Sequence, residues 1–320
     1  MKKFLLTVVG ILFAATSFAQ NSLVASLTSG ENTTYYYGGT ALKQAVADAV
    51  SGDIISLSGG IFQAINIGKA ISLRGTGIAS DNPTIISGEF TINIPSDDAK
   101  QFTMEGIKCQ NIVYLQGTFS NPYFLKSQIQ RISGYDYSDA ITNIMVVNCK
   151  VLEGIGVKGN SSAYLVNSYC GISERSDNAS ITATNCVLQT YLGNHRSDIV
   201  RFYNCIFYAP GYSEAGIAET GQATNCISTF VNIGNYASNI FHGGCINCTH
   251  GVEKVFKDLD TFELNDDIKA NFKGTDGKEV GLYGGLMPYN TTPTYPLITK
   301  MDVDEKTDAD GQLGVTIEVK

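Results

Sequence analysis

The feature that most restricts the fold of this chain is an asparagine that recurs through its middle about every twenty residues. Each time it ends a short apolar run, and in most repeats a cysteine follows it directly. Consecutive members are 19, 18, 19, 21 and 22 residues apart; they are Asn148, Asn167, Asn185, Asn204, Asn225 and Asn247. A period near twenty, with one strand and one turn residue in phase, is typical of a solenoid of stacked coils.

The chemistry of the asparagine-cysteine pair explains why it recurs. Asparagine adopts the left-handed backbone of a sharp corner more readily than most residues, and we expect its amide to bond to the same amide one coil away. Cysteine is small, apolar and usually buried, so it would begin the next strand with an inward side chain. Ser168 takes the cysteine position after Asn167, and Lys126 takes the asparagine position one repeat before Asn148.

Other segments repeat the same strand pattern. Residues 54–62, 65–77 and 102–109 largely alternate apolar and polar side chains and contain turn glycines. With the asparagine ladder, they resemble the right-handed parallel β-helix of the pectin-lyase-like superfamily, in which such a ladder forms the tight turn between the second and third strands of each coil. The resemblance implies an all-β fold of three-strand coils. The alternative is an ordinary β-sandwich in which the pairs occur by chance.

We expect the β-helix domain to occupy residues 20–287. Residues 40–50 have apolar side chains at helical spacing, with Thr40 as N-cap, and this short helix would cover the open end of the coil. Residues 255–285 resemble the closing segment of secreted bacterial β-helices, which places the last coil near residue 287. Residues 288–320 are then predicted to form a proline-rich linker and a β-hairpin tail.

The tail contains an Asp-x-Asp-Gly sequence, at residues 308–311, that is similar to part of a calcium loop. A calcium loop of that kind ends in a glutamate at its twelfth position, and no glutamate stands there. A hairpin turn is therefore the favoured interpretation.

Residues 1–19 have the features of a secretory signal peptide. Two lysines precede an apolar core, and Ser17-Phe18-Ala19 supplies small residues before a cleavage position at Gln20. Removal of the two lysines changes the net charge from −8 to −10, and an acidic chain is unsuited to nucleic acid, which needs a basic face. No later apolar run is long enough to span a bilayer. We expect a secreted protein, in the periplasm or on the outer surface of a Gram-negative bacterium.

The chain has eight cysteines. In a secreted chain this number usually indicates disulfides. Most of them follow the coil period, however, so we expect a stack of buried thiols about 4.8 Å apart. Cys245 and Cys248 form a CxxC pair near His242 and His250. Buried thiols are favoured there over a zinc or redox site, because the chain has no second CxxC pair.

The resemblance also implies where a ligand would bind. In pectin-lyase-like proteins the groove follows the first strand of each coil, which falls here eight to eleven residues after each ladder asparagine. Three basic residues occupy such positions and would form a column: Lys158, Arg175 and Arg196. Other polar residues accompany them: Glu153, Glu174, Asp177, His195, Asp198 and Glu214.

Two functions fit these residues. The preferred hypothesis is a non-catalytic protein whose exposed face, rich in Tyr, Asn, Ser and Thr, binds a glycan or another cell-surface component. The alternative is a polysaccharide lyase or glycosidase acting on acidic polysaccharide. Charged outward positions are also expected simply because they keep a solenoid soluble.

The two enzymatic versions use the candidate residues differently. In a lyase, Lys158 or Arg196 would act as base, and Arg175 would bind the uronate carboxylate. In a glycosidase, Glu174 would pair with Glu214 or Asp198. No cofactor is expected, except that a lyase could add a calcium ion.

Overall fold

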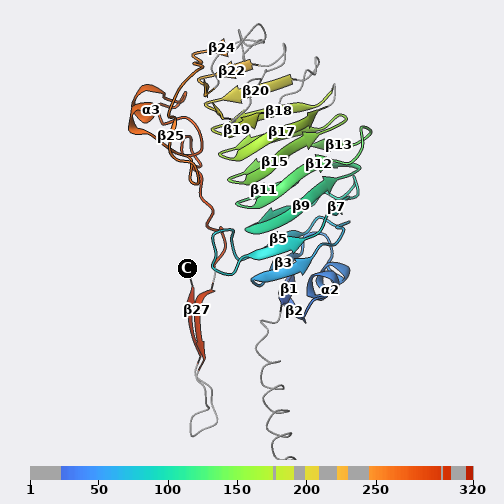
Figure 1. Cartoon of the computed structure of the whole chain (residues 1–320). Helices are drawn as coiled ribbons and strands as arrows, with labels where there is room; N and C mark the ends of the chain where they lie inside the picture. Colours follow the sequence, from blue (N-terminus) through green and yellow to red (C-terminus); the bar gives the residue numbers. More distant parts are fainter. Residues whose placement is uncertain are drawn as a thin grey trace, which may run out of the picture.

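The computed structural model of the chain describes residues 23–175, 178–190, 199–208, 222–229, 245–296, 298–303 and 315–319. Its main body is a parallel β-solenoid of about seven turns, whose coils stack one above another (Figure 1). The predicted all-β fold class is confirmed. Strands one repeat apart pair in parallel, which excludes an ordinary antiparallel β-sandwich.

Two long sheets run the length of the solenoid. The first has twelve strands, in the spatial order β2 (Asn32–Tyr37), β1 (Val24–Ser29), β3 (Ile54–Leu57), β5 (Ser72–Arg74), β8 (Thr103–Glu105), β11 (Tyr123–Leu125), β14 (Ile144–Val147), β16 (Ser162–Val166), β18 (Ser180–Thr184), β20 (Ile199–Tyr203), β22 (Gln222–Thr224) and β24 (Cys245–Ile246). The pairs that β1 makes are antiparallel and the others are parallel.

The second sheet has ten strands. Nine follow in the order β23 (Ile227–Ser228), β21 (Ile206–Phe207), β19 (Val187–Thr190), β17 (Tyr169–Arg175), β15 (Lys150–Val157), β12 (Gln128–Gly134), β9 (Ile107–Leu115), β6 (Thr84–Ser87) and β4 (Gly60–Gln63), and β7 (Phe90–Ile92) pairs with β9. Within the described ranges, the third side of the coils has one short parallel pair, β10 (Thr118–Ser120) with β13 (Ala140–Thr142).

Each ladder asparagine forms the corner between the two long sheets. All six have a positive φ, between 44° and 55°. Lys126 has a φ of 49°, so its predicted place in the ladder is confirmed. Residues with a Cβ enter this left-handed region at a cost that is smallest for asparagine and aspartate. The asparagine therefore marks the position at which the chain can turn this sharply.

The residue after each ladder position from Lys126 to Asn225 points into the core. Ser168 Oγ donates to a carbonyl two residues back (2.8 Å) and accepts the N–H of Cys149 in the neighbouring coil (3.0 Å). The sulfur of Cys226 accepts the N–H of Cys205 in the same way (3.4 Å). Serine and cysteine are interchangeable here because each has a donor and an acceptor on a short side chain. The predicted stack of buried, unpaired thiols is confirmed for Cys149, Cys186, Cys205 and Cys226.

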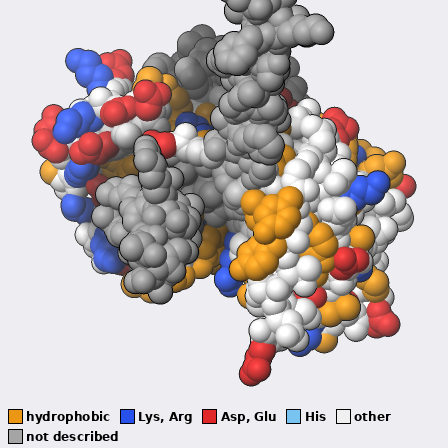
Figure 2. All heavy atoms as spheres, turned by 90° about the horizontal axis from the view of Figure 1, so that it is seen from below, with side chains coloured by type: hydrophobic (Ala, Val, Ile, Leu, Met, Phe, Trp, Pro, Cys, Tyr) orange, Lys and Arg blue, Asp and Glu red, His pale blue; other side chains and the backbone are white. Residues whose placement is uncertain are grey.

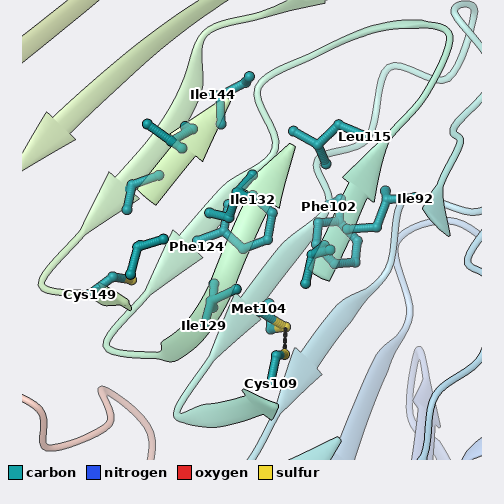
Figure 3. Close-up of a cluster of buried hydrophobic side chains, with 14 of the residues drawn as sticks. Ile92, Phe102, Met104, Cys109, Leu115, Phe124, Ile129, Ile132, Ile144 and Cys149 are labelled. Carbon is teal, nitrogen blue, oxygen red and sulfur yellow. Dashed lines mark hydrogen bonds between the residues drawn. The ribbon is translucent and has the colours of Figure 1, made fainter. Parts of the chain in front are cut away.

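Apolar side chains from both sheets fill the interior (Figure 3). The middle residue of each three-residue rung in the first sheet points inward, so that Met104, Phe124 and Val146 lie over one another. The rings of Phe102 and Phe124 meet edge to face at 6.1 Å. Burial of each large apolar side chain stabilises the folded state by about 1.5–3 kcal/mol. Each coil that places a side chain in this column is therefore stabilised.

Helix α2 (Ala41–Asp48) covers the N-terminal end of the solenoid, as predicted from residues 40–50. Its buried face packs against β1 and β3, and Lys69 Nζ donates to three carbonyls at its C-terminal end. Thr40 occupies the N-cap position as predicted, but its side chain makes no capping hydrogen bond. Figure 2 shows this end of the molecule, where acidic and basic side chains are interspersed rather than gathered into a basic face.

The segment after the last rung folds back along the ladder corner (Figure 1). We call residues 252–296 the strap; it contains β25 (Phe256–Asp258), β26 (Glu263–Leu264) and α3 (Asp266–Asn271). We expected residues 255–285 to close the last coil near residue 287. The last described rung is instead β24, and the strap returns past the earlier coils as far as Gly75, whose carbonyl accepts the hydroxyl of Tyr295.

Ladder side chains hold the upper part of the strap. Asn204 Oδ1 accepts the backbone N–H of Thr275 (3.0 Å), and Asn167 Nδ2 donates to the carbonyls of Leu282 (2.7 Å) and Gly284 (2.8 Å). The expected amide-to-amide bonds are not formed at this corner, since the Oδ1 atoms of Asn148, Asn167 and Asn185 have no hydrogen-bond partner. The prediction was wrong because the amides turn toward the strap.

One amide-to-amide bond does form at a different corner of the solenoid. Asn143 Nδ2 donates to Asn121 Oδ1 (3.1 Å), and both residues have positive φ. The spacing of the coils therefore permits hydrogen bonds between asparagine side chains. They form at this corner, where the strap does not bind the amides.

The lower part of the strap is fixed by charged side chains. Lys126 Nζ donates to the carbonyl of Thr292 (2.6 Å). The carboxylate of Glu105 accepts both the N–H (2.6 Å) and the hydroxyl (2.9 Å) of Thr294. The Arg74 guanidinium lies 5.1 Å from the ring centre of Tyr295. These contacts tie the end of the strap to three successive coils.

A second apolar cluster joins the strap to the outer face of the second sheet. One outward position repeats through seven strands, and its occupants change from polar to apolar along the solenoid: Lys108, Gln128, Lys150, Tyr169, Val187, Ile206 and Ile227. The last three are buried under strap side chains that include Phe262, Ile268 and Val280. The strap therefore covers the part of this sheet face that is apolar.

The C-terminal tail forms the predicted hairpin, in which β27 (Ile298–Val303) pairs antiparallel with β28 (Val315–Val319). Residues 308–311 and the predicted signal peptide lie outside the described residues. No helix in the described parts of the chain is long and apolar enough to cross a membrane.

The backbone at Asn148 can be tested with two substitutions. Asn148→Ala places a residue with poor tolerance of φ 52° at the corner, and we expect it to lower the free energy of unfolding by about 1–2 kcal/mol. Asn148→Gly should cost less, because glycine populates this region readily. Urea unfolding followed by circular dichroism measures both, and equal losses would contradict the role of the left-handed corner.

Two strap glycines provide a second matched pair. Gly281 and Gly277 have φ values of +79° and +77°, but a Cβ on Gly281 would lie 2.5 Å from Ile206 Cδ1, whereas a Cβ on Gly277 would meet nothing within 4 Å. Gly281→Ala should therefore destabilise the protein by about 1–3 kcal/mol more than Gly277→Ala. Thermal unfolding and protease cleavage within the strap measure the difference; equal behaviour would mean that the close approach is unimportant.

The buried thiols should make the fold sensitive to alkali. Burial raises the pKa of Cys149 from 9.0 to about 12. Between these values the unfolded thiol loses its proton and the folded thiol keeps it, so stability falls as the pH rises above about 9. Cys149→Ser keeps the donor and the acceptor but removes the titration. Its Tm should fall less steeply between about pH 8 and pH 10.5; an unchanged slope would contradict this account.

Candidate functional site

The structure describes the predicted site residues unequally. The side chains of Lys158 and Glu153 are described. Glu174 and Arg175 belong to β17, and only their backbone is described. The other predicted residues lie outside the described residues: Asp177, His195, Arg196, Asp198 and Glu214. The roles expected for these residues stay predictions.

The register of the second sheet separates two members of the predicted basic column. Arg175 is paired with Val157, and Glu174 with Gly156. Lys158 follows Val157 directly at the end of β15. Lys158 and Arg175 are thus one residue out of register, and neighbouring positions along a strand face opposite sides of a sheet. Lys158 and Arg175 follow their ladder asparagines by ten and eight residues, and this range of spacing does not by itself align them.

Lys158 is held against an aromatic ring. The aliphatic part of its side chain packs against Gly134 in the neighbouring coil. A Cβ added to Gly134 would lie 3.1 Å from Lys158 Cβ. Its Nζ atom lies 5.2 Å from the ring centre of Tyr137. A cation at this distance from an aromatic face is attracted by the ring quadrupole. The ammonium is therefore positioned by the ring and by the glycine that lets the stem pass.

A rigid loop presents this ring to solvent. Asp139 is buried, and its carboxylate accepts the backbone N–H groups of Gly117 (2.7 Å) and Asp136 (2.5 Å). Gly159 packs so closely on the loop that a Cβ there would lie 2.0 Å from the carbonyl oxygen of Asp139. The loop at residues 135–139 is thereby fixed to the coils before and after it.

Three tyrosines and the lysine form a small exposed surface at the carboxyl ends of β9, β12 and β15. The rings of Tyr114 and Tyr135 meet edge to face, with centres 5.6 Å apart at 80°. Tyr135 and Tyr137 are 54% and 68% exposed. We call Tyr114, Tyr135, Tyr137 and Lys158 the tyrosine–lysine patch. Sequence reasoning identified Lys158 but missed the tyrosines, whose signal was the run Gly134-Tyr135-Asp136-Tyr137.

Glu153 lies on the outer surface of the second sheet. Its Oε1 atom accepts a hydrogen bond from Gln130 Nε2 in the neighbouring coil (2.6 Å). The next residue, Gly154, has a φ of +98° and lies against the backbone of Gly171, which produces a bulge in β15. The hydrogen-bond partner of Glu153 is thus the side-chain amide of Gln130.

A zinc or redox site at Cys245 and Cys248 was the less favoured interpretation of the sequence. Among the described residues, no group of three or more His, Cys, Asp or Glu side chains is placed to hold a metal ion. Cys248 is disulfide-bonded, so the expectation of a buried thiol at this position is wrong. The side chain of Cys245 and all of His242 lie outside the described residues. The expected lack of a cofactor stays a prediction.

Comparisons with known proteins add no further assignment. The chain matches no family model, no curated protein and no solved structure. Any statement about function therefore depends on the solenoid itself and on the chemistry of its exposed side chains.

Proposed function

We propose that the protein is a secreted, non-catalytic β-helix of the pectin-lyase-like kind, and that it binds a glycan through the tyrosine–lysine patch. The observation that carries this proposal is the exposure of Tyr135 and Tyr137 on a loop that is held rigidly. Tyrosine is enriched at binding surfaces because one part of its side chain is apolar and the other is polar. The C–H face of a sugar ring can stack on a tyrosine ring, while the sugar hydroxyls form hydrogen bonds with the polar groups around it.

The patch has the polar groups that such a ligand needs. Tyrosine combines an apolar ring with a hydroxyl that donates and accepts hydrogen bonds. Lys158 adds a charged ammonium group beside the ring of Tyr137. Because the supporting loop is already fixed, little conformational entropy is lost when a ligand binds.

The arrangement of the patch favours a chain over a single sugar. Its members come from three successive coils, which are about 4.8 Å apart. The tyrosine–lysine patch therefore extends along the solenoid axis, so that its rings can contact successive sugar units of a polysaccharide.

The lyase or glycosidase remains the alternative, centred on Arg175, Arg196, Glu174 and Glu214. No contact among the described residues supports it in particular, and Lys158 already lies over an aromatic ring. The proposed secretion and location in the periplasm or on the cell surface rest on residues 1–19, which have the pattern of a signal peptide.

The proposal can be tested by binding of the mature chain to a glycan array, followed by titration with the strongest ligand. Loss of a stacked aromatic ring removes about 1 kcal/mol or more, so Tyr135→Ala and Tyr137→Ala should each weaken binding about fivefold to tenfold. Tyr37→Ala is the matched control, since Tyr37 is 65% exposed on β2 at the end of the first sheet. Its affinity should equal that of the unaltered chain.

The same preparation should be incubated with polygalacturonate, alginate and glycosaminoglycans while the absorbance of unsaturated products is followed. If the unaltered chain releases such products and Arg196→Ala does not, the protein is a lyase and the proposal of a non-catalytic function is wrong. Glycan binding that is unaffected by both patch substitutions would move the binding surface elsewhere.

A further inference from the structure

The N-terminal edge of the first sheet is open. Strand β2 lies at the end of that sheet (Figure 1), and in the described part of the chain it pairs with β1 alone. β2 has six residues, as many as any strand of the sheet, whereas β24 at the other end has two. A short edge strand is one way in which proteins prevent unwanted pairing. The N-terminal edge lacks this protection.

The bonds between β1 and β2 show which backbone groups face the open edge. In an antiparallel pair, every second residue directs its N–H and C=O groups to the neighbouring strand. The N–H of Gly38, directly after β2, donates to the carbonyl of Leu23 (2.8 Å). Since the register of the two strands has no shift, the even-numbered residues of β2 bond to β1. The backbone groups of Thr33, Tyr35 and Tyr37 therefore point away from β1, toward the open edge.

The sequence of β2 contains none of the residues that usually block an edge. It reads Asn-Thr-Thr-Tyr-Tyr-Tyr, without charge, proline or glycine, and its pairing with β1 has no bulge. Native edge strands are commonly protected by lysine, proline or a bulge. Threonine and tyrosine also favour strands. β2 is therefore well suited to accept a further strand.

The two faces of β2 have different surroundings. The hydroxyl of Tyr36 donates to Asp48 Oδ2 of helix α2 (2.8 Å), which places this side chain on the inner, capped face. Tyr35 and Tyr37 alternate with it and lie on the outer face, where they are 58% and 65% exposed. A strand added at the edge would bring its own side chains beside these rings, and such cross-strand contacts stabilise a sheet.

A second copy of β2 fits this edge by symmetry. Two identical antiparallel strands are related by a two-fold axis perpendicular to the sheet, which keeps the outer faces of both copies on the same side. With the axis at Tyr35, this residue faces Tyr35 of the second copy, and Thr33 faces Tyr37 of the second copy. These are the residues whose backbone groups point to the open edge, so each facing pair can exchange both N–H···O bonds. The facing Thr33 and Tyr37 also combine a β-branched with an aromatic side chain, which is a stabilising pair.

The charge distribution permits two copies to meet at this strand. The chain has a net charge of −8, so two copies repel each other where their acidic side chains meet. β2 itself is uncharged. Glu31, directly before it, would face Gly39 of the second copy in the same register, so the two Glu31 carboxylates are held apart.

We propose that the chain forms a two-fold dimer in which β2 pairs antiparallel with β2 of a second copy, with the axis at Tyr35. The first sheets of the two solenoids then join into one continuous sheet. The surface is separate from the tyrosine–lysine patch, and it does not depend on the proposed glycan binding.

Sedimentation velocity of the mature chain at increasing concentrations measures the self-association. The contact is small for a protein interface, so we expect a weak dimer with a Kd of about 10–100 µM. Tyr35→Pro should abolish the dimer, because it removes the N–H at the axis and places a proline ring at the edge. The monomer should stay folded, since this N–H makes no bond to β1 and proline is tolerated on edge strands. Thermal unfolding checks that it does.

A charge exchange tests the position of the axis. Tyr35→Lys places two ammonium groups opposite each other in the dimer, and Tyr35→Glu places two carboxylates there. Each substitution alone should weaken the association about tenfold or more. An equal mixture of the two variants should associate about as well as the unaltered chain, because opposite charges then face each other across the axis.

Cysteine cross-linking supplies a matched control on the same strand. In the proposed register the Cα atoms of the two copies of residue 35 are about 5.5 Å apart, which is within disulfide range. The two copies of residue 37 are more than about 10 Å apart. Tyr35→Cys should therefore form a disulfide-linked dimer under mild oxidation and Tyr37→Cys should not, although the two positions are similarly exposed. The unaltered chain, oxidised in parallel, controls for the native cysteines.

Three outcomes would overturn the proposal. The first is a mature chain that stays monomeric up to the limit of its solubility. The second is a dimer that Tyr35→Pro and Tyr35→Lys leave unchanged, which would place the contact on another surface. The third is cross-linking of Tyr37→Cys as readily as Tyr35→Cys, which would contradict the two-fold pairing at Tyr35.

Discussion

The left-handed backbone at each ladder position is the constraint on which the rest of the structure depends. From Lys126 onward, it turns the chain from the first sheet into the second at the same point of each coil. Since the turn is tight, the next residue must be small and must satisfy both the carbonyl before the corner and the amide of the neighbouring coil. Serine and cysteine meet these demands. The outward amide is then left at the flank, where another segment can bind it.

The strap uses those amides to connect coils that are far apart. In most repeat proteins each coil contacts its neighbours alone, and stability is close to a sum of local terms. Here one segment contacts coils from Asn204 to Gly75, with partners as distant in sequence as Gly75 and Tyr295, 220 residues apart. Opening of one coil therefore disturbs a segment that holds several others, so the coils are coupled beyond nearest neighbours.

The sequence could predict the features that depend on nearby residues. The ladder period located the corners and the thiol stack, and the helical spacing of residues 40–50 located α2. The strap could not be found in this way, because its partners are 71 to 220 residues away, and the resemblance to β-helix closing segments placed it in a final coil. A signal was present in the outward positions that become apolar at Val187 and Ile206. Of the candidate site, Lys158 was found from its spacing, but Tyr135 and Tyr137 lie in a loop outside the repeat.

The position of the strap also determines where a long ligand can bind. From the Asn204 coil downward, the ladder flank is covered by the chain's own residues, so a polysaccharide has no access to those amides. The tyrosine–lysine patch lies at the opposite ends of the second-sheet strands. A strand such as β9, Ile107–Leu115, spans about 25–30 Å at 3.3 Å per residue. The two ends of this sheet therefore serve different purposes: one binds the protein's own main chain, and the other leaves aromatic rings exposed to solvent.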